Sequence, residues 1–588
     1  MTSFKLEEFD FASDRLPESR DQPMLNNWPV VYVLNGPGEK GRGNIYLGET
    51  HSFSSRMRQH IQNDEKREKL KTVRVVLDET FNKSVCLDLE SQLIKYAAGD
   101  GSNNVLNRNI GVADPEYYNR AKYRKTFDDI FEELREAGVF QRTIPQITNS
   151  ALFKLSPFKS LNEDQAAAAV DIMDGLVEDL AEDTELGNLV FVEGDPGTGK
   201  TVVAIYLMKL ITDIGDGRDV GEADGEVDMD TVFSEFFLPG SREVFQGLKI
   251  ALVVPQQSLR KSIQNVFDKT PGLSKNMVID QWDVADDPDT FDLIIVDEAH
   301  RLNQLASQAS GVRNSKFHEI NEKLFGGEKP DASQLDWLRA KSRQVILMLD
   351  RKQTVRPADL PAEEYQELLM GGGGKEPRKY RLYTQMRSLG GNDYIQYVHD
   401  VLSPSPPAHQ QEFGEYEVGL VNSPDTLVRL IREREEEHGL SRIVAGYAWR
   451  WASKKDASAY DIDLGEGVRL QWNTKLLDWV GSKESINEAG SIHTIQGYDL
   501  NYAGVIIGED LKYDPVAQRL CIDRANYFDQ PGKQNNKMRN RPTTDEMLLE
   551  YITNIYVVLM TRGIRGTFIH VVNPELRKYM RQFFPVLG

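Results

Sequence analysis

The chain has 588 residues, of which 40% are hydrophobic, and a formal net charge of −21. This size suffices for several buried cores, and no apolar run is long enough to span a membrane. Two distant cysteines, Cys86 and Cys521, exclude a disulfide framework and a zinc motif, which fits a reducing, cytoplasmic location. The first ten residues lack an apolar stretch, so no secretory signal is expected. The acidic total argues against non-specific nucleic-acid binding, because phosphate contacts need clustered Lys and Arg.

A small α/β unit is predicted over residues 28–110. β-Branched and aromatic runs predict strands, and apolar residues at helical spacing predict helices. The predicted strands are Val30–Leu34, Ile45–Leu47 and Thr72–Leu77, and the predicted helices are Ser54–Gln62 and Val85–Ala97. We expect the domain built on this unit to occupy residues 1–120.

Two tyrosines in these strands begin a series of polar residues with defined spacing. Tyr32 ends Val30-Val31-Tyr32, and Tyr46 opens Tyr46-Leu47-Gly48. Tyrosines in strands are by themselves more often core residues. Arg56, however, follows ten residues after Tyr46, and His60 lies four residues further, on the same face of the predicted helix. The later members of the series are Glu90 and Asn107.

This series resembles the GIY-YIG nuclease family, with two departures. Val30 stands where the first motif has Gly, and the segment Asn35–Asn44 between the tyrosines is long and Gly-rich. The resemblance implies a metal-dependent site that cleaves phosphodiester bonds in DNA. A nuclease fold that has lost its activity and only binds nucleic acid is the alternative.

The resemblance also implies a role for each residue. Glu90 would bind magnesium, or manganese, and Arg56 would hold the scissile phosphate. Tyr46 would accept a proton from the attacking water, directly or by relay, with Tyr32 alongside. His60 would act as a base or orient a tyrosine, and Asn107 is a further catalytic candidate. Basic residues of this region predict a local phosphate-binding face: Arg56, Arg58, Lys66, Arg67, Lys69, Lys71 and Arg74.

The rest of the chain repeats a strand–loop–helix pattern, which is typical of parallel sheets with crossover helices. A connector is expected at 121–158, a first lobe at 159–374 and a second lobe at 375–588, with Gly371–Gly374 near the boundary. The predicted strands of the first lobe are Val190–Glu193, Ile250–Val254, Leu293–Val296 and Gln344–Leu349. Those of the second lobe are Ile443–Ala445, Ala489–His493, Gly504–Ile507 and Ile555–Met560.

Two segments of biased charge interrupt the lobes. Asp213–Glu235 is strongly acidic and is interpreted as a solvated loop, with mimicry of nucleic acid as the alternative. A basic stretch follows Tyr527 and Phe528, and it is either a nucleic-acid contact or a solvated loop. Its members are Lys533, Lys537, Arg539 and Arg541.

The first lobe contains a phosphate-binding loop. Gly194-Asp195-Pro196-Gly197-Thr198-Gly199-Lys200-Thr201 matches G-x-x-x-x-G-K-[ST] without mismatch. It follows the apolar run Leu189–Val192 and precedes the helical run Thr201–Ile211, as this motif requires. Gly194, Gly197 and Gly199 allow backbone N–H groups to surround phosphate oxygens, Lys200 reaches the β- and γ-phosphates, and Thr201 binds magnesium. ATP with magnesium is therefore the expected ligand.

A second acidic motif supports this prediction. Asp297-Glu298-Ala299-His300 ends the apolar run Leu293–Val296. A carboxylate at the end of a strand beside the P-loop holds the magnesium ion, here Asp297, through water. Glu298 would orient and deprotonate the attacking water.

Together these motifs resemble superfamily 1 helicases, and most closely the Schlafen group 3 DNA/RNA helicases. The resemblance implies an α/β fold with two RecA-like parallel-sheet lobes. Gln165 would read adenine, Gln353, with Asp350, would sense the γ-phosphate, and Arg387 and Arg562 would be arginine fingers. Segment 491–499 resembles helicase motif V, which implies nucleotide contacts by Gln496 and Asp499; related helicases carry Glu at the second position. Ala445–Trp449 resembles a further family segment.

The leading hypothesis is a fusion of a nuclease with an ATP-driven helicase that acts on DNA or RNA. It implies a role in bacterial defence against phage. Alternatives are a sensor nuclease that ATP holds inactive, and a repair or recombination helicase with a front domain that only binds. A homo-oligomer and a partner from a defence system both stay open.

Overall fold

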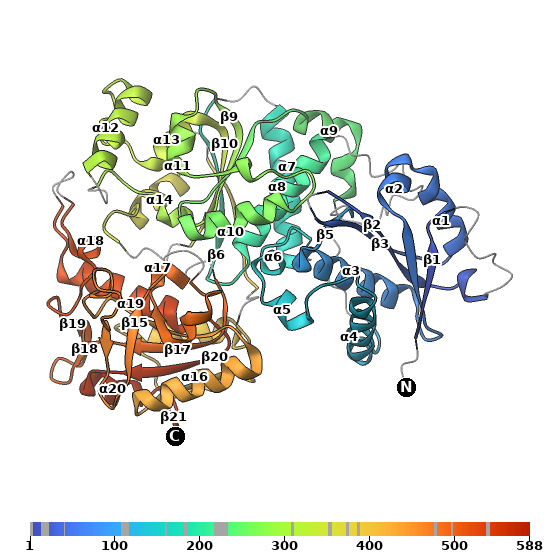
Figure 1. The fold of residues 1–588 in the computed structure, drawn as a ribbon. Helices are drawn as coiled ribbons and strands as arrows, with labels where there is room; N and C mark the ends of the chain where they lie inside the picture. Colours follow the sequence, from blue (N-terminus) through green and yellow to red (C-terminus); the bar gives the residue numbers. More distant parts are fainter. Residues whose placement is uncertain are drawn as a thin grey trace. The chain divides into compact units, whose positions relative to one another are not determined.

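The computed structural model describes residues 4–12, 23–39, 41–107, 117–158, 161–181, 185–216, 233–306, 311–350, 356–371, 376–384, 388–475, 479–495, 498–536 and 541–588 (Figure 1). The chain divides into two compact units. The first consists of Met1–Asp183, Thr201–Leu252 and Ser262–Val278, and the second of Thr184–Lys200, Val253–Lys261 and Ile279–Gly588. In the described part of the chain, no helix combines the length and apolar character that a membrane span needs.

The N-terminal part is built on a five-stranded sheet with the order β1-β4-β2-β3-β5. Its strands are β1 (Lys5–Asp10), β2 (Val30–Pro37), β3 (Gly43–Thr50), β4 (Thr72–Leu77) and β5 (Asn103–Val105). All neighbouring strands are antiparallel except β3 and β5. The register pairs Tyr32 with Gly48 and Leu34 with Tyr46, so both tyrosines point to the same face. The three predicted strands are confirmed, whereas β1 and β5 were not predicted.

Alternation along the strands creates two cores, one on each face of this sheet. Val31 and Val33 pack with α3 (Lys83–Asp100) and α4 (Arg120–Glu136), whereas Tyr32 and Leu34 pack with α1 (Phe53–Gln62). Further helices of this part are α2 (Asp64–Lys69), α5 (Ile144–Thr148) and α6 (Ala151–Lys154). Residues predicted as a connector thus contribute to the core of the sheet. Phe131, buried on α4, is an example.

The first parallel sheet has the strand order β11-β6-β10-β9-β7-β8. The strands are β6 (Asn188–Gly194), β7 (Ile250–Val253), β8 (Val278–Ile279), β9 (Phe291–Val296), β10 (Ser342–Leu349) and β11 (Arg378–Leu382). The four strands predicted for this lobe are confirmed. β11 pairs in parallel with β6, so this sheet includes residues beyond the boundary predicted near 374.

Helices follow these strands, as expected for crossover connections. They are α7 (Glu163–Ala181), α8 (Lys200–Gly215), α9 (Pro239–Phe245), α10 (Gln257–Asp268), α11 (Gln281–Asp286), α12 (Gly311–Phe325), α13 (Gln334–Lys341) and α14 (Ala362–Leu369). α8 confirms the helix predicted directly after the P-loop. Most of the acidic segment, residues 217–232, lies outside the described residues.

The second sheet contains eight strands in the order β14-β15-β16-β13-β17-β20-β12-β21. Its longest strands are β17 (Leu500–Ile507) and β20 (Gly563–Val571), which are parallel. The other strands are β12 (Glu417–Val421), β13 (Ser441–Ala445), β14 (Ile462–Asp463), β15 (Arg469–Trp472), β16 (Glu488–Gly490) and β21 (Val586–Leu587). A separate hairpin joins β18 (Leu511–Asp514) to β19 (Arg519–Ile522).

Helices cover both faces of the second sheet. α16 (Pro424–His438) packs on one face (Figure 1). The side chains of Ile443 and Ile506 join the core on that face. The other face, where Val444 and Val505 point, contacts α15 (Gly391–Val401), α19 (Asp545–Met560) and α20 (Pro574–Met580). The result is a three-layer α/β/α arrangement, which is the architecture expected for a parallel sheet. Two short helices, α17 (Ile492–Ile495) and α18 (Gln530–Lys533), lie in its connections.

Two strand predictions in this lobe are wrong. Ile555–Met560 forms the last part of helix α19, whose N-terminus is capped by the Thr544 side chain. A short, fully buried apolar run fits a strand and a helix equally well, so the run itself could not distinguish them. Ala489–His493 is divided between β16 and α17, because the strand ends at Gly490.

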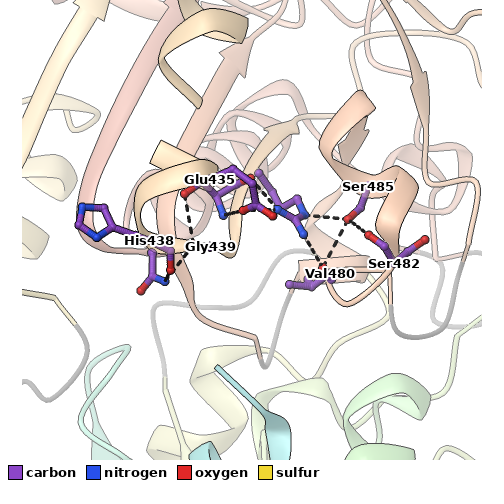
Figure 2. Close-up of polar contacts among 9 residues, drawn as sticks. Glu435, His438, Gly439, Val480, Ser482 and Ser485 are labelled. Atoms are coloured by element: carbon purple, nitrogen blue, oxygen red, sulfur yellow. Dashed lines mark hydrogen bonds and ion pairs between the residues drawn. The ribbon is translucent and has the colours of Figure 1, made fainter. Parts of the chain in front are cut away.

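A buried arginine connects three elements of the second lobe. Arg442, at the start of β13, donates from Nε to Ser485 Oγ (2.7 Å) and from Nη2 to Val480 O (3.1 Å). Its Nη1 lies 2.7 Å from a carboxylate oxygen of Glu435, near the end of α16. Figure 2 shows Glu435, Val480 and Ser485 turned toward one another around this centre. Because the guanidinium is 5% exposed, these partners compensate for its desolvation.

Candidate functional site

The P-loop lies between β6 and α8, where the sequence motif predicts it. Gly197 and Gly199 have φ angles of 87° and 81°, a region that residues with a Cβ rarely adopt. A Cβ at Gly194 would lie 2.4 Å from Thr198 Oγ1. The three glycines are therefore required by the path of the loop.

Lys200 lies at the start of α8, with its ammonium directed into the loop. Its Nζ donates to the carbonyl oxygens of Gly194 (2.5 Å) and Asp195 (3.0 Å) and lies 3.8 Å from Asp350 Oδ2. The side chain is 8% exposed. A phosphate oxygen can replace these carbonyl oxygens, because all of them are acceptors for the same three protons.

Asp297 and Glu298 follow β9 directly. Asp297 is 1% exposed, and its backbone N–H donates to Val253 O (2.9 Å). A carboxylate and a hydroxyl are oxygen donors of the kind that magnesium prefers, so Asp297 and the P-loop residue Thr201 each have the chemistry of a magnesium ligand.

Glu298 combines an unusual backbone with strong electrostatic support. Its φ of 52° lies in the left-handed region, which costs a residue with a side chain about 1–3 kcal/mol. His300 Nε2 lies 3.0 Å from Glu298 Oε2. Burial raises the pKa of Glu298, but His300, Lys200 and Arg562 together hold this pKa well below its usual range. The carboxylate is therefore ionised at neutral pH.

Arg562 supplies one of the charges that act on Glu298. It stands between α19 and β20 and is 2% exposed. Its charge lowers the pKa of Glu298 together with that of Lys200. The second lobe therefore places a guanidinium within electrostatic range of the acidic motif of the first lobe. Arg562 and Glu298 belong to the same compact unit.

A hydrogen-bonded junction joins His493, in segment 491–499, to residues for which no function was predicted. The His493 ring Nε2 is hydrogen bonded to Arg356 Nη2, and Gln256 Nε2 donates to His493 O (3.1 Å). Arg356 Nε also lies 3.6 Å from Asp529 Oδ2. Burial, followed by the charges of Arg356 and Arg301, lowers the pKa of His493 well below its ordinary value, so the ring is neutral. Isolated Gln and Arg residues carry no motif that could have revealed this junction.

Of the other residues predicted to contact the nucleotide, the structure describes only some. Gln165 is buried in the first turn of α7, where its Oε1 accepts from Asn162 N (3.2 Å) and its N donates to Asn162 Oδ1 (2.8 Å). This is a reciprocal helix cap. Asp499 is half-buried and directly precedes β17. The remaining predicted residues, Gln353, Arg387 and Gln496, lie outside the described residues.

In the front domain, four of the predicted residues converge on one face of the sheet. Tyr32 Oη lies 2.7 Å from His60 Nε2, and Arg56 Nε donates to the same hydroxyl at 3.4 Å. The rings of Tyr32 and Tyr46 are stacked with centroids 6.4 Å apart, and Tyr46 lies edge-on to His60 at 5.1 Å. A Cβ at Gly48 would lie 2.2 Å from Tyr32 Oη. The glycine of the second motif therefore provides the space for the first tyrosine.

Lys66 adds a contact that the sequence did not assign. Its Nζ lies 3.0 Å from His60 Nδ1 and 3.7 Å from the centre of the Tyr46 ring. An ammonium has only protons to donate, so His60 Nδ1 accepts and His60 Nε2 carries the ring proton. His60 consequently donates to Tyr32 Oη. The phenol oxygen thus receives hydrogen bonds from both His60 and Arg56.

Glu90 and Asn107 come from other elements, helix α3 and the residues after β5. Glu90 is half-buried on α3, which packs by Leu89 and Leu93 on the opposite face of the sheet. Asn107 accepts from Leu47 N (3.0 Å) and donates to Leu47 O (2.7 Å), so its amide extends the pairing of β3. Among the described residues, no group of three or more His, Cys, Asp or Glu could hold a metal ion. A metal at Glu90 would therefore take most of its ligands from water and phosphate, as magnesium commonly does.

The predicted phosphate-binding face is partly neutralised. Arg67 pairs with Asp64, Lys69 with Glu65 at 2.6 Å, and Arg74 with Glu8 at 2.8 Å. Arg56 and Lys66 are the members directed to the tyrosine group. Phosphate contacts by this face would therefore centre on those two residues.

The fold and the P-loop define a class, the helicase-like P-loop proteins with two parallel-sheet lobes. The chain belongs to the family described as Schlafen group 3, DNA/RNA helicase domain, whose model matches residues 187–573. This match confirms the helicase resemblance. The family implies ATP and a divalent metal, and helicase relatives act on nucleic acid. The matched range does not include the front domain.

Two further comparisons show relatives of the chain. It is 23% identical over 464 residues to the uncharacterized protein YPL245W of Saccharomyces cerevisiae, covering 74% of this chain and 93% of the yeast protein. The crystal structure of Pif1 helicase from Candida albicans is 10% identical with a TM-score of 0.21, covering 47% of this chain. This chain spans about half, 54%, of that structure.

Proposed function

We propose that this chain is an ATP-driven helicase with a nuclease at its front, and that both parts act on the same nucleic acid. The observation that carries the helicase half is the P-loop between β6 and α8, with the Lys200 ammonium directed into it and 3.8 Å from Asp350 Oδ2. Arg562, after α19, lowers the pKa of Glu298 together with Lys200, so it supplies a further cation to the acidic motif. Cations at the nucleotide stabilise the charge that phosphoryl transfer develops.

Each residue of the P-loop site has a distinct task in ATP hydrolysis. Lys200 would transfer its hydrogen bonds from the Gly194 and Asp195 carbonyls to the phosphates. Magnesium, when held by Thr201 and Asp297, would neutralise phosphate charge. Glu298 would orient the attacking water by accepting its hydrogen bond, and Arg562 would stabilise the charge that develops on the γ-phosphate.

The nuclease half rests on the hydrogen-bond chain Lys66–His60–Tyr32. Lys66 fixes the His60 tautomer, and His60 then donates to the Tyr32 oxygen. The Tyr32 hydroxyl is fully buried, so this hydrogen-bond chain would orient the site, and the half-buried Tyr46 beside it would accept the proton of the attacking water, directly or by relay. Arg56 would hold the phosphate with its guanidinium.

Lys200→Ala tests the ATPase assignment. The variant loses the ammonium that reaches the phosphates, so we expect ATP turnover to fall by at least about 100-fold, the scale of one lost electrostatic contact. Turnover is measured with purified full-length protein and a single-stranded oligonucleotide. Unchanged turnover would remove the P-loop from the mechanism.

Tyr32→Phe tests the nuclease assignment. It removes one oxygen but keeps the ring, so ATP turnover serves as the folding control. Supercoiled plasmid and labelled single strands are incubated with magnesium or manganese, with and without ATP. We expect wild-type protein to cut and Tyr32→Phe to be inactive. Absence of cutting by wild-type protein leaves a front domain that only binds.

The dependence on ATP decides between a motor and a gated sensor. Cutting that requires ATP hydrolysis supports a motor that feeds the nuclease. Cutting by Lys200→Ala that exceeds wild type in ATP supports a nuclease restrained by the nucleotide. The proposed role in phage defence is tested by plating phage on cells that express wild-type protein or Tyr32→Phe.

A further inference from the structure

A cavity of about 1000 Å³ opens in the second lobe, away from the P-loop motif and its acidic partners in sequence. Its walls come from the N-terminal half of α16, the loop after β13, the β14–β15 hairpin and the segment around residue 487. All of these elements belong to one compact unit. The volume is at the upper end of the range of about 300–1000 Å³ found for small-molecule sites, so the cavity has room for a ligand of the size of one or more nucleotides.

Two aromatic side chains line this cavity. Tyr460 is 58% exposed, which is unusual for a large ring. Trp451 is half-buried and held in place, because its Nε1 donates to Ser453 Oγ (3.1 Å) and its ring packs 6.3 Å from Trp472. The cavity therefore offers one fixed ring and one exposed ring for stacking.

The lining of the cavity carries slightly more cations than acids. Its cations are Arg432, Lys454, Arg469 and Lys475, and its acids are Asp425, Glu484 and Glu488. Arg469 is paired with Asp463 (3.0 Å), and Glu488 accepts from Trp479 Nε1 (2.7 Å) and from the Thr474 hydroxyl. The exposed cations Arg432, Lys454 and Lys475 form no ion pair with a described carboxylate, and two exposed acids, Asp425 and Glu484, stand near them. In a chain with a net charge of −21, a lining with this balance is a local exception.

Two of the three exposed cations have defined positions. Lys454 Nζ lies 5.2 Å from the centre of the Trp451 ring, so charge and aromatic surface are presented together. Arg432 Nη2 donates to Asn487 Oδ1 (3.2 Å), which directs the guanidinium across the cavity wall. Cations beside stacking rings are the combination that binds single-stranded nucleic acid, since the phosphates and the bases are then held at once.

The cavity is also connected to the helix that carries His493. Asn473 lines the cavity, and its Oδ1 accepts from Ser491 N (2.8 Å) and from Thr494 Oγ1 (2.9 Å). These residues begin and lie within α17. Hydrogen bonds thus link the cavity wall at Asn473 to the helix whose His493 contacts Arg356.

We infer that this cavity binds a single-stranded segment of nucleic acid, with bases stacked on Tyr460 and Trp451 and phosphates on Arg432, Lys454 and Lys475. The inference rests on the proposed action on nucleic acid, and it names where a strand is held. Stacking and charge tolerate every base, so binding depends on strandedness and not on sequence. A free mononucleotide shares this chemistry, and the experiment separates the two.

Tyr460→Ala is the central variant, and Tyr460→Phe is its matched control. Binding of a labelled oligothymidine to full-length protein is measured by fluorescence anisotropy, with AMP and a duplex of the same length as competitors. Loss of one stacked base weakens binding about 5- to 150-fold, whereas Phe retains the ring and should bind like wild type. Because Tyr460 is exposed, ATP turnover without nucleic acid should be unchanged.

A second pair of variants tests the phosphate contacts. Lys454→Met should reduce the slope of log affinity against log salt by about 0.7, the value for one phosphate contact on a single strand. Lys455→Met is the control, since Lys455 is exposed in the same loop but does not line the cavity. The two substitutions change the net charge equally, so a difference between their salt slopes shows that the position of Lys454 in the cavity matters, and not the total charge.

The possible outcomes separate this inference from the proposed function. If wild-type protein binds the oligothymidine and hydrolyses ATP but Tyr460→Ala and Lys454→Met bind it equally well, the cavity inference is overturned and the helicase function stands. If AMP displaces the oligothymidine at equal phosphate concentration, the cavity is a mononucleotide site and the inference is also overturned. If wild-type protein binds no nucleic acid, the proposed function fails with it.

Discussion

A buried carboxyl in the second lobe should make its stability depend on pH. Asp510 is 1% exposed, and its Oδ1 accepts a hydrogen bond from Tyr556 Oη (2.6 Å). Burial, with a smaller contribution from Glu509, raises the pKa of Asp510 to about 7, although Tyr556 and nearby backbone N–H groups oppose this rise. Tyr527 is the other titratable group that faces it.

The direction and size of the effect follow from this pKa. An unfolded aspartate has a pKa of 3.8, so between that value and about 7 the folded protein holds one more proton than the unfolded chain. The stabilisation is complete below the unfolded pKa and is lost as pH rises through the folded pKa. The free energy of unfolding should fall by about 1.4 kcal/mol per pH unit, or about 2–3 kcal/mol between about pH 5 and pH 7.

Asp510→Asn removes the titration but keeps an oxygen that accepts from Tyr556. Thermal unfolding of wild type and variant is followed in buffers of equal ionic strength between about pH 5 and pH 8. As pH rises to about 7, we expect the thermal midpoint of wild type to fall by about 5–10 °C relative to that of the variant. Above about pH 7 the two midpoints should change in the same way. Tyr556→Phe removes a hydrogen bond that lowers the pKa of Asp510, so the pH range over which stability falls should extend to higher pH. Wild-type and Asp510→Asn midpoints that run parallel throughout would refute the reasoning.

Three other predictions address the remaining sites. Arg442→Met leaves the buried acceptors Ser485 Oγ and Val480 O without their donor, so the free energy of unfolding should fall by about 1–3 kcal/mol; a thermal midpoint equal to wild type would contradict this. Glu298→Gln should retain ATP binding, measured by equilibrium titration, but lower turnover by about 100- to 10,000-fold, since the group that orients water is neutralised. Lys66→Met should move the His60 ring proton toward Nδ1 and reduce cutting, whereas Lys66→Arg should restore both. Nitrogen NMR of the labelled histidine reads the tautomer, and an unchanged tautomer would exclude Lys66 as its cause.

The features that sequence predicted best are those with a fixed spacing on one element. The P-loop needs a strand before it and a helix after it, and β6 and α8 provide both. Tyr32 and Tyr46 reach one face because alternation along two paired strands is regular. Arg56 and His60 share a face of α1 for the corresponding reason in helices.

Features that depend on packing between distant segments could not be predicted. Arg356 meets His493 across 137 positions of the chain, and no local pattern marks either residue for that contact. The helix at Ile555–Met560 is buried on several sides, so its apolar run has no period that distinguishes it from a strand. β11 pairs with β6, but only one of its five residues, Leu382, is buried, so it lacks the apolar alternation that predicts a strand.

Gly48, the glycine of the second tyrosine motif, leaves the space that the Tyr32 side chain fills. Any side chain at Gly48 would occupy the position of the Tyr32 hydroxyl. A glycine at position 48 is therefore required for Tyr32 to keep its position beside His60. Among related chains, loss of Gly48 should accompany loss of the tyrosine or of His60, whereas Val30 should be replaced only by other apolar residues, because its side chain is buried in the core. A substitution at Gly48, a residue with no reactive group, would therefore be an early sign that the front domain has lost its site and kept only its fold.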